Sequence, residues 1–212
     1  TKRLKDAGIR VVHVVASAKF AEKAQKAGCD AVVAEGFEAG GHNGREETTS
    51  FVLIPLVKAA VDIPVIAAGG IATGKQMLAA MILGAEAVQI GTRFVCTHEA
   101  SSHDSFKEAV IQAGEGATQL SMKKTVPVRL LKNAFYHKIQ AAEDAGADAS
   151  SLKEILGKGR AKKGMFEGDL EEGELEIGQV AALVQRIQPA AEVVAEIWRE
   201  YNELLESIKK GA

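Results

Sequence analysis

Apolar residues in the N-terminal part of the chain come in short, nearly continuous runs separated by longer amphipathic stretches. Four runs rich in Val, Ile and Ala predict buried strands, at Ile9–Ala16, Ala31–Ala34, Ile63–Ala68 and Ala87–Ile90. Stretches with helical spacing lie between them, at Ala18–Ala27, Phe51–Val61 and Gly74–Leu83. Such an alternation is typical of parallel strands that are covered on both faces. It predicts an α/β fold, either half of a (β/α)8 barrel or part of an open doubly wound sheet.

The pattern changes after Thr97. Helices are predicted over Ser101–Gln112, about Val128–Ala145 and Ser151–Leu156, whereas residues 157–176, rich in Gly, Lys and Glu, predict a loop or lid. An amphipathic stripe over about Ile177–Ile208 predicts a last helix, which Pro189 should kink or start anew. We therefore divide the chain into a barrel part with a phosphate site, a helical insertion or lid, and a C-terminal helix that packs back on the barrel. These parts cover residues 1–96, 97–176 and 177–212.

Composition and charge exclude several classes of protein. The 212 residues carry a net charge of −2, which argues against a groove that binds nucleic acid through its phosphates. No apolar run approaches the ~18–20 residues of a transmembrane helix, and the first residues do not resemble a secretory signal. Cys29 and Cys96 are too few for a disulfide framework, and no Cys/His spacing suggests zinc. We expect a cytoplasmic globular protein without a metal.

Two glycine motifs follow consecutive predicted strands and form the strongest local signal. One is Ala67–Ile71 (AAGGI), and the other is Gln89–Arg93 (QIGTR). Glycines there expose backbone N–H groups to a ligand, and Thr92 adds a hydroxyl. In parallel barrels, loops of this kind often hold a phosphate. The glycines could instead serve only tight turns, and the motifs do not distinguish a nucleotide, a sugar phosphate or a flavin.

A single histidine lies in a glycine-rich loop after the second predicted strand. The loop is Glu35–Gly44 (EGFEAGGHNG), and His42 is its histidine. Imidazole can act as a base, an acid or a hydrogen-bond donor near neutral pH. The alternative is an ordinary polar surface residue. A third motif, from Gly168 to Gln179, is either a solvated connector or functional, and the Cys96 thiol is expected to be inert.

Taken in order, four segments resemble those of the nitronate monooxygenase (2-nitropropane dioxygenase-like) family, and within it the enoyl-acyl-carrier-protein reductase II branch. They are EAGGHNG, IPVIAAGGIATG, GAEAVQIGTRF and GDLEEGELEIGQ. The resemblance extends over essentially the whole chain and implies a TIM barrel that binds FMN without a covalent bond. It implies that His42 is the active-site histidine. It also implies a set of cofactor-binding residues, namely Glu35, Gly40, Gly69, Gly70, Gln89, Ile90, Gly91 and Thr92, of which Gly70, Gly91 and Thr92 would hold the phosphate.

The resemblance also implies an activity and partners. The expected reaction is reduction of trans-2-enoyl-acyl carrier protein by NAD(P)H. The alternatives are oxidation of small nitronates by O2 and a half-barrel binding module without catalysis. Relatives carry further N-terminal strands, and this chain begins shortly before the fifth. We therefore expect strands 5–8 of a barrel with an inserted helical lid, completed by an N-terminal half from the same polypeptide or a second chain. A homodimer is a further expectation.

Overall fold

A computed structural model describes residues 1–211 and divides the chain into two compact units. Unit 1 comprises Thr1–Glu38, Glu46–Ile90 and the residues from Val194 onward. Unit 2 comprises Ala39–Arg45 and Gly91–Val193. The histidine loop therefore contributes to both units, because its second half and Arg45 belong to unit 2.

Unit 1 is built on a four-stranded parallel sheet, as the apolar runs predict. Its strands are β1 (Val12–Val15), β2 (Ala31–Glu35), β4 (Val65–Ala68) and β5 (Ala87–Gln89). They are hydrogen-bonded in the order β1-β2-β4-β5, with Val14 opposite Val33 and Ala67 opposite both Ala34 and Val88. Since all three neighbouring pairs are parallel, the carboxyl ends of the four strands lie at one edge of the sheet.

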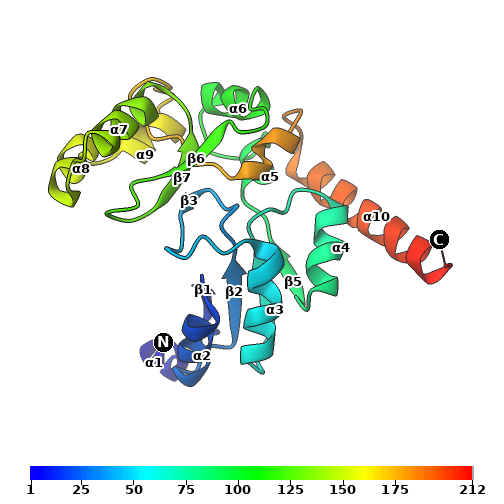
Figure 1. Ribbon diagram of the computed structural model, residues 1–212. Coiled ribbons are helices and arrows are strands. Elements are labelled where there is room, and N and C mark those ends of the chain that lie inside the picture. Colours follow the sequence, from blue (N-terminus) through cyan, green and yellow to red (C-terminus); the bar gives the residue numbers. More distant parts are fainter. Residues whose placement is uncertain (212) are drawn as a thin grey trace. The chain divides into compact units, whose positions relative to one another are not determined.

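Short helices connect these strands, and Figure 1 shows α3 and α4 next to the sheet. The helices are α1 (Lys2–Asp6), α2 (Ala18–Lys26), α3 (Ser50–Ala60) and α4 (Gly74–Ile82). The hydroxyls of Ser17 and Thr73 accept hydrogen bonds from backbone N–H groups in the first turns of α2 and α4. The core between helices and strands consists of small and branched apolar residues, including Val15, Ala21, Val32, Leu53, Val57 and Val65.

Unit 2 contains a three-stranded antiparallel sheet that the sequence pattern did not predict. Its strands are β3 (Gly41–His42), β7 (Val128–Leu131) and β6 (Thr118–Ser121), in that order. The prediction of a helix from Val128 is wrong over β7. All four residues of β7 are buried, so they show no alternation and merge in sequence with the following helix, α7 (Ala134–Asp144). That helix starts at Asn133, whose side chain accepts from the N–H of Tyr136.

The remaining helices of unit 2 are short. They are α5 (Thr92–Val95), α6 (Asp104–Ile111), α8 (Ala149–Leu156), α9 (Arg160–Met165) and the 3-10 helix η1 (Gln179–Leu183). Helix α9 lies within residues 157–176, where a loop was predicted. The Arg160 guanidinium holds it, donating to the Glu172 carboxylate at 2.9 Å and lying over the Phe135 ring. Because Glu172 and Phe135 lie outside the helix in sequence, the residues of α9 alone do not predict it.

The last helix, α10 (Ala190–Lys209), is shorter than predicted. Pro189 does start a new helix, and the Glu99 carboxylate accepts from the N–H of Ala190 at 2.9 Å. The prediction of a helix from Ile177 is wrong, since that segment forms η1 and a bridge between Gln188 and Thr97. In unit 1, the Glu200 carboxylate of α10 accepts from the N–H of Gly74 at 2.7 Å.

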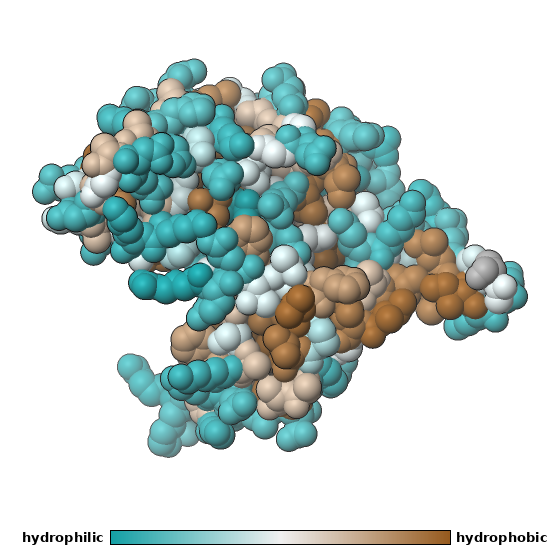
Figure 2. Space-filling model, in the orientation of Figure 1, coloured by the Kyte–Doolittle hydropathy of each residue, from teal (hydrophilic) through white to brown (hydrophobic). Residues whose placement is uncertain are grey.

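Apolar side chains remain exposed on parts of the surface. Figure 2 shows apolar atoms gathered along α10, where Val194, Trp198 and Ile208 are each more than 50% exposed. On the edge strand β1, Val12 and Val14 are about half exposed. None of the helices described for residues 1–211 is long and apolar enough to cross a membrane.

Candidate active site

The carboxyl ends of β2 and β4 bring Glu35 and the first glycine motif together in unit 1. Glu35, the last residue of β2, is paired with Ala68, the last residue of β4. The N–H of Gly36 donates to the carbonyl of Ala68 at 2.9 Å, which extends the pairing by one residue. Burial raises the pKa of the Glu35 carboxyl. A proton is thus retained on this strand-end side chain to higher pH than on an exposed glutamate.

Gly69 and Gly70 follow β4 with left-handed backbone angles, φ +83° and +72°. This conformation favours glycine. The first residue of α3 holds the loop, because the Ser50 hydroxyl lies 2.9 Å from the Gly69 carbonyl and 3.0 Å from the Glu38 carboxylate. The Ser50 N–H donates to the same carboxylate at 2.9 Å. A Cβ on Gly70 would lie 3.4 Å from the Glu38 carboxyl, which is an ordinary contact distance, so the positive φ rather than crowding favours glycine there.

The second glycine motif begins in unit 1 and continues into unit 2. Gln89 ends β5 opposite Ala68, and Ile90 is the last residue of this segment of unit 1. Gly91 begins unit 2, and a Cβ on it would meet no atom within 4 Å. The backbone beside Gly91 therefore faces open space. Thr92 is buried, and its hydroxyl oxygen accepts from the N–H of Gly178 at 3.0 Å.

Gly178 joins three of the sequence motifs within unit 2. It belongs to the late segment GDLEEGELEIGQ and contacts Thr92 of the second glycine motif. A Cβ on Gly40 would lie 2.5 Å from the backbone nitrogen of Gly178, which only glycine tolerates. Gly178 thus packs against the backbone of the histidine loop at Gly40 and donates to the Thr92 side chain. The end of the late segment is therefore packed within unit 2 rather than solvated.

His42 lies on the two-residue strand β3, and its side chain is exposed. Gly41 and His42 are paired with Arg129 and Val128 of β7. Asn43, the residue after His42, also holds the loop. Its N–H donates to the carbonyl of Pro127, and its side chain donates to the carbonyl of Ala39. A histidine held by backbone pairing on a rigid strand can present its imidazole to a ligand without a large ordering cost.

Sequence reasoning missed two glutamates of the late segment, Glu174 and Glu176, and the second of them lies beside this loop. Glu176 is bridged to Leu130 of β7, and its carboxylate oxygen lies 2.6 Å from the position of a Cβ on Gly41. Burial raises the pKa of Glu176, and the His42 imidazole lowers it in part. Burial also raises the pKa of Glu174 to about 7, with a second contribution from the Glu176 charge. The signal was the alternation of acidic residues with the buried Leu175 and Ile177.

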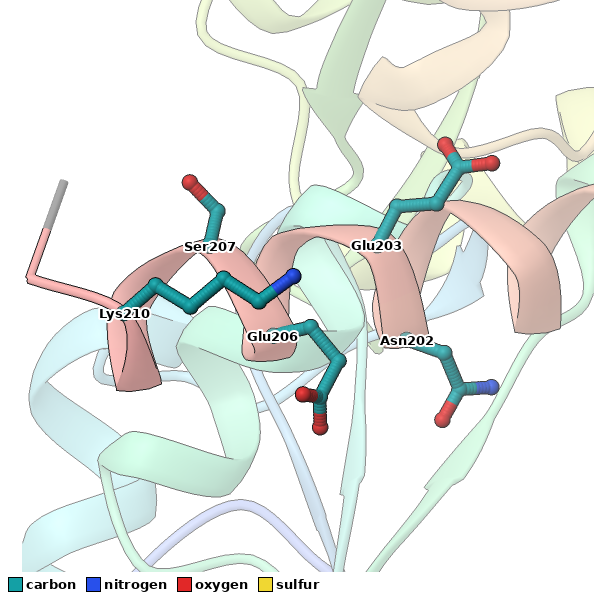
Figure 3. Close-up of a pocket in the computed structure, with 5 residues that line it drawn as sticks. All are labelled: Asn202, Glu203, Glu206, Ser207 and Lys210. Carbon is teal, nitrogen blue, oxygen red and sulfur yellow. The ribbon is translucent and has the colours of Figure 1, made fainter.

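Other candidate groups do not join this region. Cys96 is buried, and burial raises its pKa to about 11, which disfavours the reactive thiolate form. Within residues 1–211, no group of three His, Cys, Asp or Glu side chains could hold a metal ion. Figure 3 shows a surface hollow lined by Asn202, Glu203, Glu206, Ser207 and Lys210. Four of them come from α10 and Lys210 directly follows it, so the hollow lacks the converging elements of a catalytic site.

Comparisons with known proteins decide the family. A family model described as nitronate monooxygenase matches residues 1–200. The chain belongs to this family. The nitronate monooxygenase of Paraburkholderia phytofirmans is 33% identical over 99% of this chain and 59% of its own length.

Two solved structures of relatives cover almost the whole chain. FabK from Thermotoga maritima is 42% identical, with a TM-score of 0.93 over 100% of this chain and 67% of its own. Nitroalkane oxidase from Streptomyces ansochromogenes is 33% identical, with a TM-score of 0.80 over 98% of this chain and 61% of its own. Members of the nitronate monooxygenase family thus share the α/β fold described above. The chain spans about 60% of the length of the curated relatives that it matches.

Proposed function

We propose that the protein is an FMN-dependent oxidoreductase that reduces trans-2-enoyl-acyl carrier protein with NAD(P)H. The observation that carries this choice is the likeness to FabK, an enoyl-acyl-carrier-protein reductase II, which is 42% identical at a TM-score of 0.93. The likeness to nitroalkane oxidase is lower on both measures, at 33% and 0.80.

The glycine motifs are suited to a phosphate-bearing cofactor. The open space at the Cβ position of Gly91 leaves its backbone accessible to a ligand, and the positive φ angles of Gly69 and Gly70 turn the chain sharply at the end of β4. In this proposal, Gly70, Gly91 and Thr92 contribute to binding the FMN phosphate. Glu35, Gly40, Gly69, Gln89 and Ile90 contact other parts of the cofactor.

When bound, FMN would supply the hydride-transfer chemistry between NAD(P)H and the acceptor double bond. The protein residues would bind and orient the reactants. His42, exposed on a rigid strand, would donate a hydrogen bond or a proton at the thioester carbonyl oxygen of the substrate. The backbone contacts at Gly178 would keep this histidine loop and Thr92 in a fixed arrangement within unit 2.

We further propose that the parallel sheet of unit 1 is half of a (β/α)8 barrel, with residues 157–176 as a lid. The edge strand β1 supports the first part, because Val12 and Val14 are about half exposed on it. Additional parallel strands would cover these side chains and pair the open edge. Such strands would belong to the same polypeptide or to a second chain.

Nitronate monooxygenase activity is the second candidate. The matching family model and the Paraburkholderia relative both carry that name. In that case a nitronate and O2 would be the substrates, and NAD(P)H would not be needed. A half-barrel that binds a phosphate compound without catalysis is a third candidate.

The visible absorbance spectrum of the purified protein, followed by anaerobic addition of NADPH, tests these candidates. A flavin spectrum that bleaches with NADPH and recovers with a crotonoyl thioester is the expected result. A flavin that is reduced only by a nitronate would replace the reductase with the monooxygenase. A colourless protein that acquires no flavin from added FMN would contradict both enzymes.

A further inference from the structure

Glu176 has a position that the reaction proposed above leaves unexplained. Its backbone is bridged to Leu130, next to the Gly41–Arg129 pair on β7. Its carboxylate oxygen lies 2.6 Å from the position that a Cβ on Gly41 would take. Gly41 has φ +73° and no side chain, so the carboxylate rests directly on the backbone next to His42.

This placement sets the charge around His42. Burial raises the pKa of the Glu176 carboxyl, and the nearby His42 lowers it in part. The other charged groups of the elements packed here are Glu174 on the same segment and Arg129 on β7. The Arg129 side chain is 2% exposed, and its guanidinium donates to the hydroxyl of Thr118 at 3.3 Å.

We propose that Glu176 is a specificity-determining residue that favours neutral acceptors over anionic ones at His42. This inference rests on the proposed function. An ionised Glu176 carboxylate that rests on the backbone next to His42 would repel an incoming anion. An enoyl thioester carbonyl is neutral and requires only a hydrogen bond. A nitronate is an anion, and it would meet the carboxylate at short range in a partly desolvated site.

The test compares two substrates in three variants of the FMN-bound, full-length protein. Glu176→Gln removes the charge and keeps the shape, and Glu176→Asp keeps the charge. Glu171→Gln is the control, because it removes a charge from an exposed position of the same segment. The measured quantities are kcat/KM for a crotonoyl thioester with NADPH and kcat/KM for ethylnitronate with O2. The dissociation constant of nitrite, an unreactive anion, is followed through the NMR signals of His42.

We expect Glu176→Gln to raise kcat/KM for ethylnitronate and to tighten nitrite binding about tenfold, with the thioester value unchanged within about twofold. Glu176→Asp and Glu171→Gln should behave like the wild type. An unchanged substrate ratio and unchanged nitrite affinity in Glu176→Gln would overturn the proposal, as would a Glu176→Asp variant that behaves like it. If no variant turns over either substrate, the proposed function fails, and nitrite binding still decides the role of Glu176.

Discussion

The buried carboxyl of Glu174 makes the stability of this protein depend on pH in a direction opposite to that of most acidic residues. Its side chain is 6% exposed, and burial raises its pKa from 4.5 to about 7. The folded state therefore binds the Glu174 proton more tightly than the unfolded state does. Its contribution to stability is fully present below about pH 4.5 and is lost as the pH rises to about 7.

The size of this effect follows from the shift. A difference of 2.5 units between 7 and 4.5, at about 1.36 kcal/mol per unit, gives at most about 3 kcal/mol of lost stability at pH 8. Glu174→Gln keeps the shape of the side chain but cannot ionise. At pH 8 the variant should therefore exceed the wild type in free energy of unfolding by about 2–3 kcal/mol. At pH 4.5 the difference should be much smaller, because the wild-type carboxyl is then protonated.

Denaturant unfolding of both proteins at the two pH values measures this difference. Titrating groups that do not interact with Glu174 cancel, since only the change between variant and wild type is compared at each pH; Glu176, which does interact, contributes to the measured difference. Glu171→Gln, at an exposed position of the same segment, should show no such pH-dependent gain. A Glu174→Gln effect of the same size at pH 4.5 and pH 8 would refute the argument that a buried charge is the cause.

Three further predictions concern single residues. Gly91→Ala should raise the free energy of unfolding by about 0.4–1 kcal/mol, because the φ of −101° at Gly91 suits alanine and the added Cβ would have no atom within 4 Å. The same substitution should weaken FMN binding in equilibrium titrations, and unchanged affinity would remove Gly91 from the phosphate site. His42→Ala should retain FMN and lose about 100-fold or more in turnover, measured with the crotonoyl thioester; wild-type turnover would discard its catalytic role. Gly74→Ala should lower the free energy of unfolding, measured by thermal unfolding, by about 1–3 kcal/mol, because the added Cβ would lie 2.5 Å from the Ile197 carbonyl oxygen. Gly114→Ala is the control and should change this free energy little, because a Cβ on Gly114 would have no atom within 4 Å.

The parallel sheet was predictable because each of its strands can be recognised from its own residues and from the helices next to it in sequence. Runs such as Ala31–Ala34 are apolar without alternation, and helices of ordinary length separate them, which leaves few alternatives to parallel strands. Pro189 likewise marked the start of α10 correctly, since its ring fits the beginning of a helix and not the interior. The antiparallel sheet was not predictable, because two-residue β3 and fully buried β7 carry no period of their own.

The site was predictable in its parts and not in its assembly. Glycines after strands and a histidine between glycines are visible in the sequence, and they directed attention to His42 and Gly91. The contacts of Gly178 with Thr92 and Gly40 join segments far apart in the chain. The same holds for Glu176, which appears in sequence as one of several acids in a polar stretch. Its role depends on the missing side chain of Gly41, a contact that no local pattern encodes.

Unit 2 combines an early segment of the chain, Ala39–Arg45, with a much later one, and this affects how the chain folds during synthesis. Strands β1, β2, β4 and β5 can pair as they leave the ribosome, because their order in the sheet is their order in the chain. Gly41 and His42 emerge early, yet their partners Arg129 and Val128 are made much later. The histidine loop therefore lacks its β7 partner while the strands of unit 1 that precede and follow it in the chain pair with one another. Pairing this distant in sequence is slow. Nascent chains that stop before Val128 should accordingly hold a formed parallel sheet and an open, protease-sensitive histidine loop.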